Sequence, residues 1–562
     1  MKNIFDTLYP YQKEVVDITD KNDRGIICLP TGTGKTYCQA AILTKDIQKY
    51  TNVSNIYVVN APRIMLTYQL MKEFYGFLIN NNIQSRMMFV HSGGSVDLQE
   101  LEDIRVNADM DHIDTKYMDI GSWTSIEGIK EMMLKAKSQN LPLVLFSTYK
   151  SAKNIEIARK ELGLDPIRMV FNDEAHYLVG KEYHDLIEFI QEDKEFFFTA
   201  TMRNTLSNNN RGMQNVGQYG EVLYKMIPRE AIELGKMVRP RMHILTTELT
   251  RKERYHNEDM YDQAYNNLIF NAYKEHSKVI SNMGAKMLVS VKGTIEMEKF
   301  LKGNQYLALR NEGVNIFMVS SREEIGNNIN GVEVKRSEFL KTLKEMGQKD
   351  DVKMVVFHYD ILSEGIDVSG FTGMLPLRNL TTSKFLQTYG RTARLHSMDR
   401  KNIENGSLQP NELDKMVKPY AYVIIPKITL DNDEAMENFK NLINNLRDLD
   451  FNPIEDIIGY SDPQGLGEEE LMEGLNEIER NNIATQLMLD LFNELEDTRI
   501  ASLSTNNYIN ELDNVIFTKK PKKVKITNQA KLDLGVEPIT KKELQLRNKS
   551  IFNKFKTIIG WK

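Results

Sequence analysis

The sequence predicts an α/β protein built on parallel sheets, followed by a mostly α-helical C-terminal region. Short apolar segments alternate with amphipathic segments of helix length through the first two thirds of the 562 residues. A glycine-rich loop follows the first apolar segment, and an acidic pair follows a later one. Such alternation is typical of βαβ units, in which helices cover the faces of a parallel sheet. The length predicts about three or four domains.

The predicted strands fall into two blocks, separated by a helix over 228–237 and a linker over 238–241. The first block has predicted strands at 25–30, 56–60, 87–91, 143–148, 168–173 and 196–201. The second block has them at 286–291, 315–320, 352–359, 374–377 and 420–426. We therefore predict an N-terminal domain over 1–237 and a second domain over 238–430.

Two regions lie outside this pattern. The connection over about 92–140 is long for a parallel sheet and acidic in its middle, so it is predicted to be an insertion. Residues 431–517 hold 21 acidic and four basic residues, whereas 518–562 hold 13 Lys or Arg and three acidic residues. We predict that 431–562 forms an acidic helical region followed by a basic tail. The tail is expected to contact DNA or a protein partner, or to be only a solvated end.

The composition excludes several classes. With 41% hydrophobic and 27% charged residues, the chain resembles an ordinary globular protein. No apolar run approaches the roughly 20 residues of a membrane helix, and no export signal is recognisable at the N-terminus, so a cytoplasmic protein without a membrane partner is expected. The two cysteines, Cys28 and Cys38, are expected to be core residues. A net charge of −6 requires any nucleic-acid-binding surface to be local.

A phosphate-binding loop is predicted between the first strand and a helix over 37–47. The loop residues are Pro30, Thr31, Gly32, Thr33, Gly34, Lys35 and Thr36. Glycines let several backbone N–H groups point at one anion, and the following helix adds its positive end. Lys35 is expected to reach the β- and γ-phosphates of a nucleotide, and Thr36 to ligate Mg²⁺. Leu29 stands where the general pattern has its first glycine.

An acidic pair, Asp173 and Glu174, follows the predicted buried strand over 168–173. A phosphate loop needs a carboxylate that holds the metal and a group that activates water. We predict that Asp173 holds Mg²⁺ and that Glu174 orients and deprotonates the attacking water. An acidic pair on its own could equally be a helix N-cap, and the phosphate loop favours the catalytic interpretation.

With these residues in place, the chain resembles the superfamily 2 helicases and translocases of the DEAD/DEAH-box type. The segments that resemble family motifs, in family order, are 9–12, 30–36, 61–69, 147–151, 173–176, 199–201, 286–293, 363–367 and 387–394. The resemblance covers about residues 5–426 and implies two tandem RecA-like domains that bind ATP between them. One departure is Asn172, which stands where an aliphatic residue usually precedes the acidic pair.

The resemblance also implies roles for particular residues. Further ATP-binding residues are Gln12, which would read the adenine edge, with Gly365, Asp367 and Gln387. Arg391 and Arg394 resemble arginines that reach the γ-phosphate, where such a residue accelerates hydrolysis by about 10³–10⁵. The coupling residues are His176, Thr199 and Thr201, and the nucleic-acid contacts are Arg63, Thr148 and Lys150.

Two details favour DNA over RNA. The loop reads Thr-Gly-Thr-Gly, where spliceosomal-type RNA helicases usually carry Gly-Glu-Thr-Gly. Residues 9–16, 221–225 and 228–240 look more like restriction-enzyme motor subunits and branch-migrating bacteriophage helicases. The expected function is therefore an ATP- and Mg²⁺-dependent helicase or translocase on duplex or branched DNA, in a bacterial or phage-infected cell. Protein partners would belong to a replication, recombination or restriction assembly. The alternatives are an RNA helicase, or a nucleic-acid-dependent ATPase switch or motor subunit of a defence complex.

Overall fold

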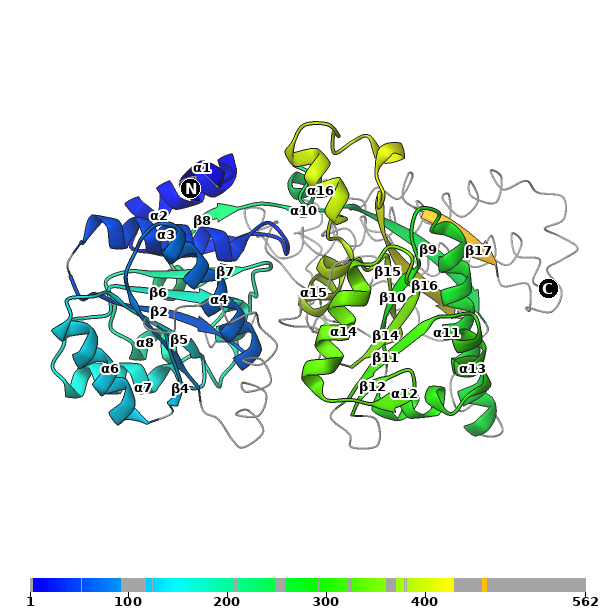
Figure 1. Ribbon diagram of the computed structural model, residues 1–562, viewed down its shortest axis with the longest axis horizontal. Helices are drawn as coiled ribbons and strands as arrows, with labels where there is room; N and C mark the ends of the chain where they lie inside the picture. Colours follow the sequence, from blue (N-terminus) through cyan, green and yellow to red (C-terminus); the bar gives the residue numbers. More distant parts are fainter. Residues whose placement is uncertain are drawn as a thin grey trace, which may run out of the picture. The chain divides into compact units, whose positions relative to one another are not determined.

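The computed structural model describes residues 4–51, 53–91, 118–123, 125–205, 211–247, 258–291, 293–320, 326–359, 370–378, 380, 382–428 and 457–461. The chain divides into two compact units, Met1–Phe451 and Asn452–Lys562. The first unit contains two sheets flanked by helices, drawn in blue to cyan and in green to yellow in Figure 1. In the second unit, the described residues form strand β17 (Ile457–Ser461).

The N-terminal sheet is parallel throughout and has the strand order β4-β3-β5-β2-β6-β7-β1-β8. Its strands are β1 (Arg24–Cys28), β2 (Ile56–Ala61), β3 (Arg86–Val90), β4 (Met118–Trp123), β5 (Leu143–Thr148), β6 (Met169–Asp173), β7 (Glu195–Thr199) and β8 (Glu221–Lys225). Every residue of β2, β5 and β6 is buried. Burial on both faces explains why these strands are almost continuously apolar in the sequence.

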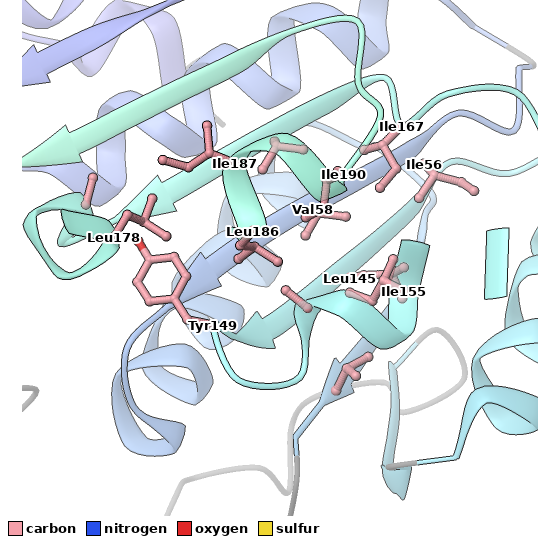
Figure 2. Packing of buried hydrophobic residues seen from close by; sticks show 14 of the residues in the cluster. Ile56, Val58, Leu145, Tyr149, Ile155, Ile167, Leu178, Leu186, Ile187 and Ile190 are labelled. Atoms are coloured by element: carbon pink, nitrogen blue, oxygen red, sulfur yellow. The ribbon is translucent and has the colours of Figure 1, made fainter. Parts of the chain in front are cut away.

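Helices cover both faces of this sheet. The helices in this part of the chain are α1 (Ile4–Thr7), α2 (Pro10–Lys21), α3 (Lys35–Lys49), α4 (Ile64–Asn80), α6 (Ile126–Ser138), α7 (Ala152–Glu161), α8 (Leu186–Phe189), α9 (Val216–Tyr219), α10 (Pro228–Glu233) and the 3₁₀ helix η3 (Ala175–Val179). Figure 2 shows part of the core, where Leu186 and Ile187 of α8 and Ile155 of α7 gather with Val58 and Leu145 of the sheet. Full burial of one such side chain stabilises the fold by about 1.5–3 kcal/mol.

The second sheet contains, within the first unit, the strand order β13-β12-β11-β14-β10-β15-β16-β9. Its strands are β9 (Arg239–Thr247), β10 (Lys286–Ser290), β11 (Asn315–Val319), β12 (Asn327–Ile329), β13 (Val332–Glu333), β14 (Met354–His358), β15 (Gly373–Pro376) and β16 (Tyr420–Ile428). Among these described strands, the antiparallel pairs are those of the short β12 with β11 and with β13. The central strands β10, β11 and β14 pair in parallel and are almost entirely buried.

The helices of the second sheet are α11 (Glu258–Val279), α12 (Thr294–Leu301), α13 (Asn304–Asn311), α14 (Arg336–Gln348), α15 (Thr382–Thr392), α16 (Ser397–Glu404) and the 3₁₀ helix η5 (Leu413–Lys415). Helices α11, α12 and α13 pack against one another, and α14 and α15 lie on the opposite side of the sheet (Figure 1). The α/β fold class and its parallel sheets are therefore confirmed. The C-terminal region that was predicted to be helical lies almost wholly outside the described residues.

Each strand predicted from the sequence is present, with both ends within two residues of the prediction. The linker predicted at 238–241 is wrong, because β9 begins at Arg239 and pairs in parallel with β16 along its whole length. The start of β9, Arg-Pro-Arg, contains a proline and two charged residues, which resemble a connection more than a strand. The end of the predicted insertion contributes β4 and α6 to the N-terminal sheet and its helices.

Two smaller predictions can also be compared with the structure. Cys28 and Cys38 are both buried and form no disulfide, as expected for core residues. No helix in the described part of the chain has the length and apolar character needed to span a membrane.

Candidate active site

The predicted site residues of the N-terminal domain follow the carboxyl ends of neighbouring parallel strands. The phosphate loop follows β1, Asp173 ends β6 with Glu174 directly after it, and Thr199 ends β7; these three strands are adjacent in the order β6-β7-β1. Because the carboxyl ends of parallel strands meet at one edge of the sheet, the topology brings these segments together. The backbone confirms this proximity, since the N–H of Leu29 donates to the carbonyl of Thr199 at 2.9 Å.

The phosphate loop depends on two glycines with left-handed backbone. Gly32 has φ +88° and Gly34 has φ +83°, values that side-chain-bearing residues rarely adopt. Helix α3 begins at Lys35, directly after Gly34, so its free N–H groups face the concave side of the loop. The Thr33 hydroxyl donates to the carbonyl of Pro30 at 2.7 Å and stabilises the turn. The loop therefore has the geometry of an anion cradle.

Gln12 lies against the loop and is almost fully buried, at 4% exposure. Its Nε2 donates to the carbonyl of Thr33 at 3.1 Å, and its Oε1 accepts from the N–H of Tyr9 at 3.0 Å. The Tyr11 hydroxyl donates to the same carbonyl of Thr33 at 2.6 Å. Gln12 and Tyr11 thus fix the backbone of the phosphate loop, and sequence reasoning did not assign this role to Tyr11.

Asp173 is buried at the end of β6. Its Oδ1 accepts a hydrogen bond from Nε2 of Gln39 at 2.9 Å. Burial and the neighbouring Glu174 carboxylate raise the pKa of Asp173 above its ordinary value, and Lys35 opposes this rise. A buried carboxylate whose pKa is raised in this way favours a cation as its partner.

The oxygen donors around Thr36 fit a magnesium ion. The hydroxyl of Thr36 hydrogen-bonds with the carboxylate of Glu73 on α4, which also accepts from Nε2 of Gln69 at 3.1 Å. Burial raises the pKa of Glu73. Carboxylate and hydroxyl oxygens are the ligands that Mg²⁺ prefers, and the ion usually takes its remaining ligands from phosphates and water. Asp173 and Thr36 are the residues that would hold the ion, and Glu73 is a hydrogen-bonding neighbour of Thr36 that the sequence did not reveal.

Glu174 has a strained backbone. Its φ is +49° and its ψ +47°, which places a non-glycine residue in the left-handed region. Such a conformation costs on the order of 1 kcal/mol or more and concentrates at functional sites. This conformation changes the direction of the chain between β6 and η3. The Oε1 of Glu174 lies 3.8 Å from Nζ of Lys35.

His176 connects three of the predicted motifs. It is buried, and burial lowers its pKa to about 4, so the imidazole is neutral near pH 7. The amide Nε2 of Gln387 lies 3.2 Å from Nε2 of His176, and Nδ1 of His176 lies 3.2 Å from the Thr199 hydroxyl. Because an amide nitrogen can only donate, Nε2 accepts and Nδ1 carries the proton that is donated to Thr199. The Thr199 hydroxyl then donates to the carbonyl of Thr201 at 2.8 Å.

The helix that carries the two predicted arginines approaches the phosphate loop. A Cβ placed on Gly390 of α15 would lie 2.7 Å from Cβ of Thr31, so only glycine fits at this contact. Arg391 is 8% exposed and lies in the last turn of the same helix. Arg394 follows it, and burial lowers its pKa to about 10, so it stays charged near pH 7; Glu73 opposes this shift. Two arginines are thereby placed in a partly desolvated environment near the loop, where a cation interacts strongly with phosphate.

The predicted nucleic-acid contacts lie at the same edge of the N-terminal sheet. Arg63 follows β2 and Thr148 ends β5, two adjacent strands in which Ala61 pairs with Thr148. Arg63 and Lys150 are exposed, whereas Thr148 is 5% exposed and its hydroxyl donates to the Ser151 hydroxyl at 3.2 Å. The basic side chains are therefore accessible to phosphates, and Thr148 is an internal hydrogen-bonding residue in this structure. Gly365 and Asp367 lie outside the described residues.

Comparisons with known proteins agree with this geometry. Residues 6–204 match the family model described as "Type III restriction enzyme, res subunit". No curated protein matches the sequence. Among solved structures, the chain is similar to an ATP-dependent Type ISP restriction-modification enzyme, LlaBIII, bound to DNA, with 18% identity and a TM-score of 0.59 over 85% of this chain and 32% of that one. A nuclease-deletion mutant of the Type ISP enzyme LlaGI with a DNA substrate mimic gives 17% identity and a TM-score of 0.50, over 79% of this chain and 29% of that one.

The chain thus spans about a third of the length of these two structures. At such low identity, the structural likeness establishes the fold, that of two tandem RecA-like helicase domains. The family match covers the phosphate loop, the acidic pair and the Thr199–Thr201 segment. Over these residues the chain is therefore similar to the res subunit of Type III restriction enzymes.

Proposed function

We propose that this protein is an ATP-dependent DNA helicase or translocase, which couples ATP hydrolysis to movement along, or remodelling of, duplex or branched DNA. The observation that carries the proposal is the hydrogen-bonded chain Gln387–His176–Thr199. It joins the segment after the acidic pair to a helix of the second sheet, so a change at the nucleotide can move one domain against the other. DNA is favoured over RNA because the matching family is that of a restriction-enzyme subunit.

The chain's own residues divide the reaction into steps. The backbone of the phosphate loop and Lys35 bind the phosphates. Glu174 orients the attacking water and accepts its proton, and Arg391 and Arg394 stabilise the charge that develops on the phosphoryl group. Mg²⁺, bound by Asp173 and Thr36, would supply charge neutralisation at the phosphate oxygens. Arg63 and Lys150 would contact the phosphates of one DNA strand without reading its sequence.

The first test is steady-state ATP hydrolysis by the full chain with no nucleic acid, single-stranded DNA, duplex DNA, branched DNA or RNA, with Lys35→Ala as the blank. Strong stimulation by duplex or branched DNA supports the proposal, and displacement of a third strand from a DNA triplex would then show translocation. Stimulation by RNA alone would replace it with an RNA helicase. Hydrolysis that no nucleic acid stimulates would favour a switch or a subunit that needs a protein partner.

Cytoplasmic location, a bacterial or phage-infected host, and protein partners in a replication, recombination or restriction assembly stay predictions. The neighbouring genes would test the last of these, because a motor subunit of a restriction system would lie beside a nuclease or methyltransferase gene.

A further inference from the structure

Lys418 is a buried lysine whose ammonium group contacts the end of the helix that carries the two arginines. It lies just before β16 and is 2% exposed. Its Nζ donates to the carbonyl of Thr392 at 2.5 Å and to the carbonyl of Arg394 at 2.7 Å. The last carbonyls of a helix have no partner within the helix and carry the negative end of its dipole, so a cation there is stabilising.

These hydrogen bonds act on the backbone from which both arginines project. Arg391 is in the last turn of α15, and Arg394 follows two residues after the helix ends at Thr392. Between them, the carbonyl of Ala393 accepts from the N–H of Val238 at 2.8 Å. Lys418 therefore supplies the partners for two of the three consecutive carbonyls over 392–394.

Lys418 is itself held in place by Asp399 of α16, which is 1% exposed. The Asp399 Oδ1 accepts from the backbone N–H of Val417 at 2.8 Å, and its Oδ2 accepts from the N–H of Lys418 at 2.9 Å. A carboxylate that accepts two backbone hydrogen bonds fixes the local main chain. The end of α15, the start of β16 and helix α16 thus form one hydrogen-bonded unit around the Lys418 side chain.

Packing alone does not explain a lysine at this position. Burial, with Lys286 and Arg394 nearby, lowers the pKa of Lys418 to about 7, and Asp399 opposes this shift. An amine whose charged form is disfavoured to this degree is costly to bury, and an apolar side chain of similar length would fill the space without that cost. What the amine adds is its hydrogen bonds to the two carbonyls.

We propose that Lys418 is a positioning residue for ATP hydrolysis, which holds Arg391 and Arg394 in place through the backbone carbonyls at the end of α15. This inference rests on the proposed role of the two arginines at the γ-phosphate. It assigns no contact with the nucleotide to Lys418.

The test is Lys418→Met in the full chain, with kcat and KM for ATP measured in saturating DNA and the affinity for a non-hydrolysable ATP analogue measured separately. Because a displacement of about 1 Å costs roughly 100-fold in a rate, we expect kcat to fall by about 10- to 100-fold. Analogue affinity should stay near that of the wild type. Lys418→Arg keeps the cation and should recover part of the lost kcat.

Arg310 offers a control in the same domain. Its Nη1 donates to the carbonyl of Val314 at 2.7 Å, just beyond the end of α13. No predicted site residue lies on α13. Arg310→Met therefore removes a contact between a cationic side chain and a backbone carbonyl near a helix end. It should have a much smaller effect on kcat than Lys418→Met.

A double-mutant cycle separates positioning from general destabilisation. Arg394→Ala alone should lower kcat more than analogue affinity, and adding Lys418→Met to it should then cost much less than in the wild type. Equal losses in both backgrounds, or an unchanged kcat in Lys418→Met, would overturn the inference. If Lys418→Met does not fold, Asp399→Asn, which weakens the hold on the Lys418 main chain, carries the same cycle.

The variant Lys35→Ala tests the proposed function separately from the role of Lys418. If Lys35→Ala still hydrolyses ATP, the ATP site is misassigned and the inference falls with it. If Lys35→Ala is inactive but Lys418→Met has a normal kcat, the proposed function stands and only the role of Lys418 is rejected.

Discussion

The Nζ of Lys35 lies 3.8 Å from the Oε1 of Glu174, and both side chains are partly buried, at 10% and 17% exposure. This pair joins the start of α3 to the end of β6. The ammonium group is thus oriented toward the place where the acidic pair and the phosphate loop meet, and the strained backbone of Glu174 holds the carboxylate there. Two predictions depend on this relationship.

The first concerns Lys35→Ala. Loss of the cation leaves the phosphate charge without its side-chain partner, so we expect ATP hydrolysis to fall by about 100-fold or more. Lys45→Ala is the matched control, since Lys45 lies on the same helix and pairs at the surface with Asp17, at 2.8 Å. Phosphate release from ATP is measured for both variants. Near-normal hydrolysis by Lys35→Ala would mean that the loop does not belong to the active site.

The second concerns Glu174→Gln, which keeps the size of the side chain and removes the base. We expect ATP binding to persist while turnover falls by about 10²–10⁴-fold, the usual contribution of a general base. Binding of a fluorescent ATP analogue and single-turnover hydrolysis measure the two quantities separately. Glu182→Gln, at an exposed position beyond η3, is the control. Parallel loss of binding and turnover would argue that Glu174 is structural.

Local sequence patterns predicted the strands and the glycine-rich loop well, for a physical reason. A buried parallel strand such as β5 must be apolar along its whole length, and a phosphate loop must have glycine where φ is positive, as at Gly32 and Gly34. Both requirements act on neighbouring residues, so they are visible in one stretch of sequence. The linker prediction failed because the strand character of β9 comes from its pairing with β16, far away in the chain.

The supporting contacts could not be predicted, because they join residues that are distant in sequence. Lys418 and Arg394, or Glu73 and Thr36, meet only after the chain has folded. Sequence order places Lys418 in an unremarkable stretch between two predicted elements. A signal did exist at Asn172, whose polar side chain interrupts an apolar strand and thereby indicated a buried partner.

A further prediction concerns Gln387. Gln387→Leu removes the donor to Nε2 of His176, at 3.2 Å, and leaves a buried ring nitrogen without that hydrogen bond. We expect DNA-stimulated ATP hydrolysis to fall by about tenfold, in line with about 1–3 kcal/mol for an unsatisfied buried group. Thr388→Val is the control, because the Thr388 hydroxyl donates only within its own helix, to the carbonyl of Lys384 at 2.8 Å.

The same contact can be tested by combining Gln387→Leu with His176→Leu. If the two residues act through their mutual hydrogen bond, the double variant should lose little more than either single variant. Additive losses would mean that Gln387 acts elsewhere, for example directly on the nucleotide, as the family resemblance implies.

The last prediction concerns Glu195, the partner of Asn172. The Asn172 Nδ2 donates to Oε1 of Glu195 at 2.8 Å, and Arg24 lies 3.0 Å from Oε2. Burial raises the pKa of Glu195 to about 8, Glu192 adds to this rise, and Arg24 and Asn172 oppose it. Between the ordinary pKa of 4.5 and about 8, the folded protein therefore binds more protons than the unfolded chain. The stability from this group is complete at low pH and is lost as pH rises through about 8.

Glu195→Gln should remove this pH dependence, because glutamine keeps the acceptor for Asn172 and cannot ionise. We expect its melting temperature to exceed that of the wild type by about 2–4 °C at pH 8.5, with little difference at pH 5.5. Glu221→Gln, at an exposed position of β8, should follow the wild-type curve at every pH. Thermal unfolding from pH 5.5 to 8.5 measures all three proteins. If the wild type instead has the higher melting temperature at high pH, the ion pair with Arg24 outweighs the cost of burial, and Glu195 is charged in the folded protein.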